Sequence, residues 1–308
     1  MELKKVNYIS DEELTSYKKE LFNSIINDSS FYKEVLLSSF TNEDIMSNLS
    51  LFDEWRKNFN IVKNIKSYQD CVKFNTFEKL ILVRDKKFID REYEVLPYVL
   101  DNIVYNSRFI VKDFSDNFNS LSLRNIDSKT QLSLVKAQLK NKRKMLYFLG
   151  ASRTGKTYLS IAIVNNFIKN SEGKVAFLNT TMRFQELIDL LFSKNVNDKN
   201  EFNNLLKEYS TCSLLVLDGL GNERKSEFIR DSILLPILKN RNNNKVVTII
   251  NSNYTLEELA ILYSFNKEDG KIIANTIKNI INSQIESIVD FGSTPNLYWN
   301  TINCYLFV

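Results

Sequence analysis

GASRTGKT, at residues 150–157, matches the phosphate-binding pattern G-x-x-x-x-G-K-[ST]. An apolar run over 145–149 precedes it, and a predicted amphipathic helix over 156–169 follows it. In such a loop the glycines let backbone N–H groups approach phosphates, the lysine places a positive charge at the outer phosphates, and the final hydroxyl binds magnesium. The octet therefore predicts a nucleoside-triphosphate site. The alternative is a strand–turn–helix connection without a ligand.

A second strand-like run ends in a carboxylate. Leu214-Leu215-Val216-Leu217 precedes Asp218, which a buried parallel strand would present beside the phosphates. We therefore predict that Thr157 and Asp218 bind Mg²⁺, although a surface aspartate that closes a strand is the alternative. The next position is Gly219, where most ATPases of this architecture carry Asp or Glu. Such a chain is expected to hold a nucleoside triphosphate and to cleave it poorly.

Further polar residues near these motifs are candidates for catalysis. Asn251 and Asn253 end another strand-like run, and either could orient water against the terminal phosphate, with turn capping as the alternative for each. Glu223, one turn beyond Asp218, could substitute for the missing acid. The predicted catalytic residues are Asp218, Asn253 and Glu223. The predicted ATP ligands are Gly150, Ser152, Thr154, Gly155, Lys156, Thr157 and Tyr158.

Composition excludes several kinds of chemistry. The chain of 308 residues contains no histidine, which excludes His-based triads, His-ligated metals and His acid–base catalysis. Its formal net charge of +4 is too small to indicate nucleic-acid binding by itself. Any catalysis must therefore use carboxylates, lysine, threonine or a bound metal ion.

Cysteine usage and hydropathy indicate the compartment. Cys71, Cys212 and Cys304 lie far apart and form no C-x-x-C pair, which suits a reducing environment and argues against a structural zinc site. No apolar run approaches the length that crosses a bilayer. We therefore expect a cytoplasmic protein with no membrane partner.

Glycine distribution divides the chain. All seven glycines lie at or beyond residue 150, and the first 149 residues contain a single proline, Pro97. We predict a mostly helical domain over 1–110, a linker over 111–126 and a second domain over 127–308. Within the first domain, Thr41-Asn42-Glu43-Asp44 predicts a capped helix start, and 80–95 predicts a small β-hairpin.

Helical and strand-like segments alternate in the second domain. Strands are predicted over 145–149, 174–178, 213–218 and 245–251. Helices are predicted over 128–142, 156–169, 182–193, 200–209 and 226–240. Strands separated by helices form a parallel, doubly wound sheet, so the fold class is α/β.

Four segments carry a resemblance to a known family: 149–159, 214–221, 228–231 and 248–254. In order and spacing they resemble bacterial helicase loaders of the DnaI/DnaC type, over roughly residues 127–290. The resemblance implies an AAA+ P-loop ATPase fold for 127–308 and a helicase-binding domain at 1–110. It also implies ATP and Mg²⁺ as cofactors, a role in the primosome during DNA replication, and three interactions. These are binding of the replicative hexameric helicase, contact with single-stranded DNA, and self-assembly with ATP.

Three departures qualify that resemblance. DnaI-type loaders carry a cysteine-ligated zinc in the N-terminal domain, whereas Cys71 stands alone here, so we predict that the zinc is lost. Gly219 replaces the second acid. No arginine follows Arg241, so the last long helix, 271–288, lacks the arginines that in the family reach the nucleotide. A missing base costs about 10²–10⁴ in rate and a missing arginine finger on the order of 10³–10⁵. Whether the chain is an enzyme therefore stays open.

Basic residues are the candidates for DNA contact. Lys194 and Lys199 follow the 182–193 helix, and a further basic group is Lys140, Lys142, Arg143 and Lys144. Lysines on a solvated face are the alternative explanation for all of them.

Four functional hypotheses follow. The first is a helicase loader that binds ATP and hydrolyses it weakly or not at all. The second is a non-enzymatic, nucleotide-binding adaptor of the primosome. The third is the ATPase subunit of a transposition system, which the long N-terminal extension disfavours. The fourth, small-molecule phosphotransfer, would need an arginine-rich lid, and the sequence contains none.

Overall fold

The computed structural model describes residues 11–85, 88–126, 129–140 and 144–293. The chain forms two compact units, Met1–Val104 and Tyr105–Val308. None of the helices described is long and apolar enough to cross a membrane.

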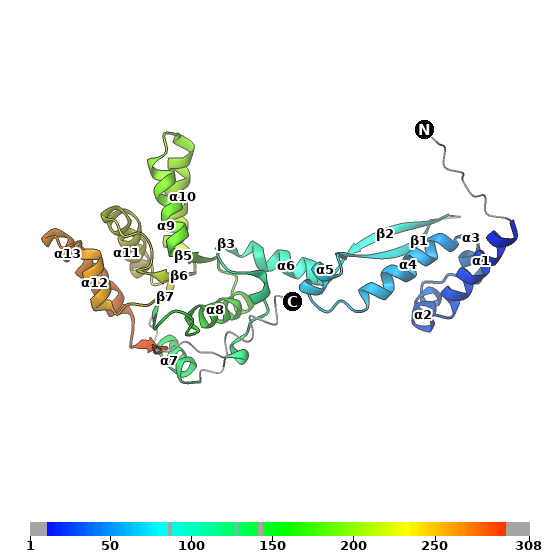
Figure 1. Ribbon diagram of the computed structural model, residues 1–308, viewed down its shortest axis with the longest axis horizontal. Coiled ribbons are helices and arrows are strands. Elements are labelled where there is room, and N and C mark those ends of the chain that lie inside the picture. Colours follow the sequence, from blue (N-terminus) through cyan, green and yellow to red (C-terminus); the bar gives the residue numbers. More distant parts are fainter. Residues whose placement is uncertain (1–10, 86–87, 127–128, 141–143, 294–308) are drawn as a thin grey trace, which may run out of the picture. The chain divides into compact units, whose positions relative to one another are not determined.

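The first unit contains short helices and one hairpin (Figure 1). Its elements are α1 (Asp11–Ile26), α2 (Ser29–Leu37), α3 (Asn42–Ser47), α4 (Leu49–Val62), α5 (Tyr68–Lys73), β1 (Glu78–Asp85), β2 (Phe88–Val95) and the first part of α6 (Pro97–Ser107). The predicted capping box is confirmed at α3, where the Thr41 hydroxyl accepts from Asp44 N and Thr41 N donates to the Asp44 carboxylate. Phe31, Phe52 and Trp55 form a buried aromatic core, against which β1 packs Leu80 and Leu82.

The second unit is a six-stranded parallel sheet in the order β3-β5-β6-β7-β4-β8. The strands are β3 (Phe109–Lys112), β4 (Met145–Leu149), β5 (Val175–Asn179), β6 (Leu214–Leu220), β7 (Val247–Ser252) and β8 (Ile288–Asp290). The helices are α7 (Lys129–Lys140), α8 (Lys156–Asn170), α9 (Thr180–Phe192), α10 (Val196–Thr211), a π-helical turn (Ile229–Leu234), α11 (Leu235–Asn244), α12 (Leu256–Ser264) and α13 (Glu268–Gln284).

Both faces of this sheet are buried. Alternate strand residues such as Tyr147 and Leu217 pack against α9 to α13, whereas their neighbours, such as Phe148 and Val216, pack against α7 and α8 (Figure 1). Strands covered on both faces read as continuous apolar runs, which is why the sequence pattern identified them. The predicted α/β P-loop fold is confirmed.

The structure differs from the expected linker over 111–126. Part of this stretch extends the sheet as β3, which pairs with β5. Phe114 then packs on Phe177, with ring centroids 5.0 Å apart, and the side chain of Asn165 on α8 donates to the carbonyls of Phe118 and Leu121. The stretch therefore belongs to the second unit, because its aromatic rings and backbone are anchored there.

Candidate functional site

The predicted site residues converge at the carboxyl ends of the central strands. The phosphate-binding loop follows β4, whose Leu149 lies beside Ser252 of β7. On the other side of β7, Asn251 lies beside Asp218 of β6. Ligands of open α/β sheets bind outside these strand ends. One intervening strand thus brings together motifs that are some sixty residues apart in sequence.

The loop has the backbone geometry that its glycines permit. Gly155 has φ 101° and caps the start of α8, so the first backbone N–H groups of that helix face the loop. Gly150 has φ 152°, and a Cβ added there would lie 2.9 Å from the Gly292 carbonyl oxygen. A side chain at either position would strain the loop. The loop is therefore suited to an anion that is held by backbone amides.

Lys156 is buried in this loop, and its ammonium group contacts backbone carbonyls of the loop. Its Nζ donates to Gly150 O at 2.6 Å, to Ala151 O at 2.7 Å and to Asn253 Oδ1 at 3.1 Å. Burial lowers the pKa of Lys156, and the negative charge of Asp218 opposes this shift. A triphosphate would give this poorly solvated ammonium anionic partners in place of neutral carbonyls.

Thr157 and Asp218, which are predicted to bind magnesium, lie in contact. The Thr157 hydroxyl donates to Asp218 Oδ1 at 2.9 Å, and Asn251 Nδ2 donates to the same oxygen at 2.6 Å. Burial raises the pKa of Asp218, whereas these two hydrogen bonds and the charge of Lys156 lower it. A hydroxyl and a carboxylate at this separation are hard oxygen ligands of the kind Mg²⁺ prefers. Both residues would fit as ligands of a magnesium ion, which would supply positive charge beside a bound phosphate.

The two asparagines, which the sequence left as alternatives, have separate contacts. Asn251 is fully buried between Asp218 and Ser160, whose hydroxyl donates to Asn251 Oδ1 at 2.9 Å. Asn253 reaches the loop and contacts Lys156 and Ser152. The predicted role of Asn253 at the phosphates stays a prediction. The structure adds Ser160 and Asn251 as residues that position Asp218, and no sequence motif marks Ser160.

The remaining predicted ligands lie in or beside the loop. The Thr154 hydroxyl is buried and donates to Ala151 O at 2.9 Å, which closes the loop on itself. Ser152 is exposed at its tip. Tyr158 lies on the first turn of α8 with its ring 6.0 Å from that of Phe118. Thr154 therefore shapes the loop, whereas Ser152 is open to a ligand.

Glu223 is placed differently from a free catalytic base. Its side chain is 2% exposed and accepts from Gly221 N at 2.9 Å, from the Tyr263 hydroxyl and from the Thr180 hydroxyl at 3.3 Å. The Thr180 hydroxyl also lies 3.2 Å from the carbonyl oxygen of Asp218. Through these hydrogen bonds, the buried Glu223 side chain holds the turn after β6 in place. The catalytic role of Glu223 stays a prediction that the contacts do not favour.

Gly219 occupies a backbone conformation that L-residues rarely adopt. Its φ is +85°, and the register with β7 shifts between Asp218 and Leu220. A Cβ at this position would lie 3.4 Å from Asn222 Nδ2 and 3.8 Å from Thr180 Oγ1, so there is space for a side chain but the backbone is unfavourable. The backbone of this turn therefore disfavours an acidic residue at position 219, in addition to the fact that the residue there is glycine.

We expect Gly219→Asp to lower the free energy of unfolding without restoring hydrolysis. The left-handed backbone costs a non-glycine residue about 1–2 kcal/mol, and the carboxylate would start beside Asn222 and Thr180. Denaturant unfolding and steady-state phosphate release measure the two effects. Asn222→Asp is the matched control, because it adds the same carboxylate at an exposed neighbour whose φ is not positive. A hundredfold gain in hydrolysis by Gly219→Asp would contradict this expectation.

Comparison with known protein families identifies the family to which this chain belongs. The family described as IstB-like ATP binding protein matches residues 76–274, well over half of the chain. The chain belongs to this family. The match spans the phosphate-binding loop, Asp218 and both asparagines.

One curated relative of this IstB-like protein agrees with the predicted resemblance to helicase loaders. The replicative helicase loader DnaI of Bacillus subtilis (strain 168) is 26% identical over 131 residues, which is 42% of this chain and 40% of that protein. The match thus spans less than half the length of this curated relative. A crystal structure of DnaI superimposes with a TM-score of 0.49 at 23% identity, over 60% of this chain and 97% of that one. For the DnaC helicase loader the TM-score is 0.45 at 22% identity, over 57% and 99%.

Arg230 and the two lysines of α13 in this IstB-like protein are engaged in its own fold. Arg230 is buried, pairs with Asp231 at 2.5 Å and donates to Tyr263 O at 2.8 Å. On α13, Lys271 pairs with Glu268 and Lys278 pairs with Glu257. Arg224, by contrast, is exposed, and no ion pair of its side chain is described.

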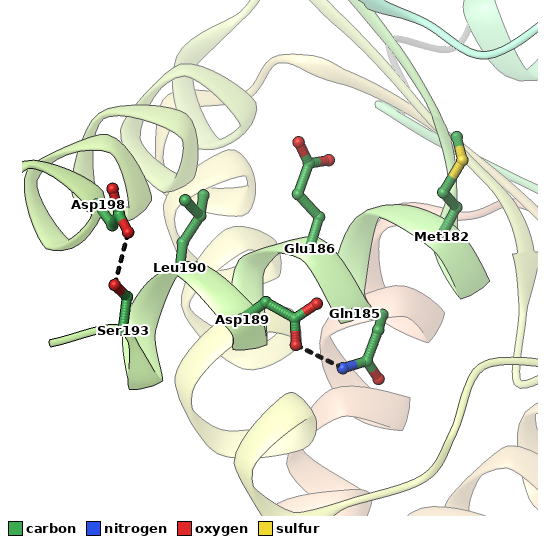
Figure 2. A pocket seen from close by; sticks show the side chains of 7 residues that line it. All are labelled: Met182, Gln185, Glu186, Asp189, Leu190, Ser193 and Asp198. Carbon is green, nitrogen blue, oxygen red and sulfur yellow. Dashed lines mark hydrogen bonds between the residues drawn. The ribbon is translucent and has the colours of Figure 1, made fainter. Parts of the chain in front are cut away.

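The surface beside Lys194 and Lys199 carries more acid than base. A groove between α9 and the start of α10 is lined by Met182, Gln185, Glu186, Asp189, Leu190, Ser193 and Asp198 (Figure 2). Its three carboxylates disfavour a phosphate backbone. DNA contact by Lys194 and Lys199, which are both exposed, stays a prediction. Of the other basic candidates, 141–143 lie outside the described residues, as does the side chain of Lys140.

Proposed function

We propose that this IstB-like protein is an ATP-binding loader of the replicative hexameric helicase, acting in DNA replication with weak or absent ATP hydrolysis. The observation that carries the nucleotide part is the contact of Thr157 with Asp218 beside a buried Lys156. The helicase part is supported by the similarity to the B. subtilis loader. In this proposal ATP binds with Mg²⁺ held by Thr157 and Asp218.

Weak hydrolysis follows from the groups around the phosphates. Gly219 supplies no carboxylate, and the carboxylate of Glu223 is occupied by three donors. A general base contributes about 10²–10⁴ in rate, or roughly 3–5 kcal/mol of barrier. Ground-state binding depends on the loop amides, Lys156 and magnesium, so it would survive this loss. ATP would then act as a ligand that orders the second unit and favours self-assembly.

The division of labour is also part of the proposal. The first unit would bind the helicase, and the second would bind ATP and, within an assembly, single-stranded DNA. The chain divides between Val104 and Tyr105, so a helicase-binding fragment would end near 104 rather than at 110. We place the DNA contact away from the acidic groove between α9 and α10.

Co-purification with the replicative helicase of the same organism tests this function. Full-length protein and helicase are mixed with and without ATP and Mg²⁺ and separated by size-exclusion chromatography with light scattering. We expect a complex whose amount rises with ATP, and Asp218→Ala is expected to remove the response to ATP while basal binding remains. Failure to form a complex under both conditions would exclude the loader. A complex that ignores ATP would instead select the non-enzymatic adaptor.

A further inference from the structure

The outer strand of the hairpin in the first unit, β2, is largely exposed. Seven of the eight residues of β2 are exposed, among them Phe88 at 77% and Tyr93 at 56%. By contrast, β1 buries Leu80 and Leu82 against α4, which it lies alongside (Figure 1). An isolated two-stranded hairpin is marginal in water, and it gains stability from a third strand or a covering helix.

The two edges of this hairpin differ. The outer edge of β1 is capped by Asn58 of α4, whose Oδ1 accepts from Leu80 N at 2.9 Å and whose Nδ2 donates to Glu78 O at 3.4 Å. Within the described part of the chain, β2 pairs with β1 alone. Alternate backbone N–H and C=O groups of β2 therefore point outward. Of these, Arg91 N donates to Asp90 Oδ1 at 2.7 Å, a local contact that an added strand would have to replace. The strand carries neither the proline nor the lysine that commonly protects an edge.

Charge is segregated on this strand. Directly opposite residues share a face, and Tyr93 and Arg91 lie opposite Leu80 and Leu82, which face α4. Arg91 accordingly pairs with Glu54 of α4 at 2.8 Å. The other face of β2 presents a row of three carboxylates at alternate positions. They belong to Asp90, Glu92 and Glu94, and none of them forms an ion pair with a described residue.

A second copy of the chain is a poor occupant of this edge. Two identical strands that pair antiparallel about a two-fold axis keep each residue on its own face, so even-numbered positions lie opposite even-numbered positions. Every such register that pairs five or more residues of β2 places at least one of the acids at 90, 92 and 94 opposite an acid of the other copy. Like charges directly opposite are destabilising. The row of carboxylates therefore protects the edge against self-pairing and selects a partner of opposite charge.

We propose that the outer edge of β2 binds an extended segment of a partner protein by β-strand addition, and that this segment carries Lys or Arg at alternate positions. Backbone hydrogen bonds would supply affinity, and pairing of the basic side chains with Asp90, Glu92 and Glu94 would supply specificity. The intervening residues of the segment would lie on the face of Tyr93 and Ile89 and suit small or apolar side chains. This site is independent of the nucleotide and of the proposed function.

A nine-residue peptide of alternating lysine and threonine, blocked at both ends, is the probe. Full-length protein is titrated by fluorescence anisotropy, and amide hydrogen exchange is followed with and without peptide. We expect saturable binding with slower exchange confined to β2. Glu92→Lys/Glu94→Lys is expected to weaken binding at least tenfold and to bind the corresponding glutamate–threonine peptide instead. Glu20→Lys/Glu43→Lys, which changes two exposed helix carboxylates, is the control and should bind as the wild type does.

Backbone recognition is tested separately from charge. Two further peptides carry N-methyl groups on every second residue, one for each edge of the peptide strand. At least one is expected to lose tenfold or more in affinity, because an N-methylated edge cannot donate. Equal binding of all three peptides would overturn strand addition, and unchanged binding by Glu92→Lys/Glu94→Lys would overturn the assigned edge. Slow exchange of β2 in peptide-free protein that dimerises would likewise overturn the proposal in favour of self-pairing.

Discussion

Lys156→Ala is expected to weaken ATP binding by a factor on the order of 10² or more. Truncating one partner of a buried, hydrogen-bonded charge pair costs roughly 2–5 kcal/mol, and each 1.4 kcal/mol is a factor of ten. Lys156 is 7% exposed, and its Nζ donates to the carbonyls of Gly150 and Ala151 at the start of the loop. Arg153, the other cation of the loop, is exposed and makes no described contact with the loop carbonyls that hold Lys156.

Isothermal titration with ATP and Mg²⁺ measures this loss. Lys169→Ala is the matched control, since it removes an exposed lysine from the last turn of the same helix, α8, and should leave affinity unchanged. Circular dichroism checks that both variants are folded. A loss of less than about threefold by Lys156→Ala would mean that the loop binds its ligand without the lysine, which contradicts the assigned site.

Arg241→Met is expected to destabilise the second unit by about 3–5 kcal/mol. Arg241 is fully buried, and its guanidinium donates to four oxygen acceptors, Tyr209 O, Cys212 O, Val247 O and Thr248 Oγ1, and to Cys212 Sγ. Two of these carbonyls lie at the C-terminal end of α10, where the helix dipole favours a cation. Methionine would fill most of the volume but leave buried acceptors unpaired, and each unpaired acceptor costs about 1–3 kcal/mol.

Hydrogen exchange of β6 and β7 amides reports the free energy of opening in this unit without interference from the first unit. Arg224→Met changes an exposed arginine and is expected to stay within about 0.5 kcal/mol of the wild type. A similarly small effect of Arg241→Met would show that its hydrogen bonds are replaced by water, and that the guanidinium does not join α10 to the sheet.

The local motifs of the nucleotide site could be predicted from sequence. The loop at 150–157 and the run ending at Asp218 are contiguous, and their residue types follow from what phosphate and magnesium require. The alternation of apolar strands with amphipathic helices likewise predicted the parallel sheet. The capped start of α3 at Thr41 was readable for the same reason, since a cap involves residues three apart.

Contacts between distant segments were decided by the tertiary structure. Sequence spacing did not reveal that β7 lies between β4 and β6. This strand order lets Asn251 hydrogen-bond to Asp218 and lets Asn253 accept a hydrogen bond from Lys156. Nor did it reveal that 109–112 would extend the sheet, because a four-residue edge strand has too few residues to show a period.

Burial distinguishes polar residues that look equally available in the sequence. In sequence, Glu223 could have substituted for the missing acid, but it lies inside the fold and accepts from Tyr263 of α12. Arg230 is likewise buried and donates to Tyr263 O. A sequence by itself determined which side chains suit a magnesium-bound triphosphate. Only the tertiary structure decided which of them reach the loop. A buried polar group forms hydrogen bonds with the groups that packing places beside it, so its partners depend on the fold.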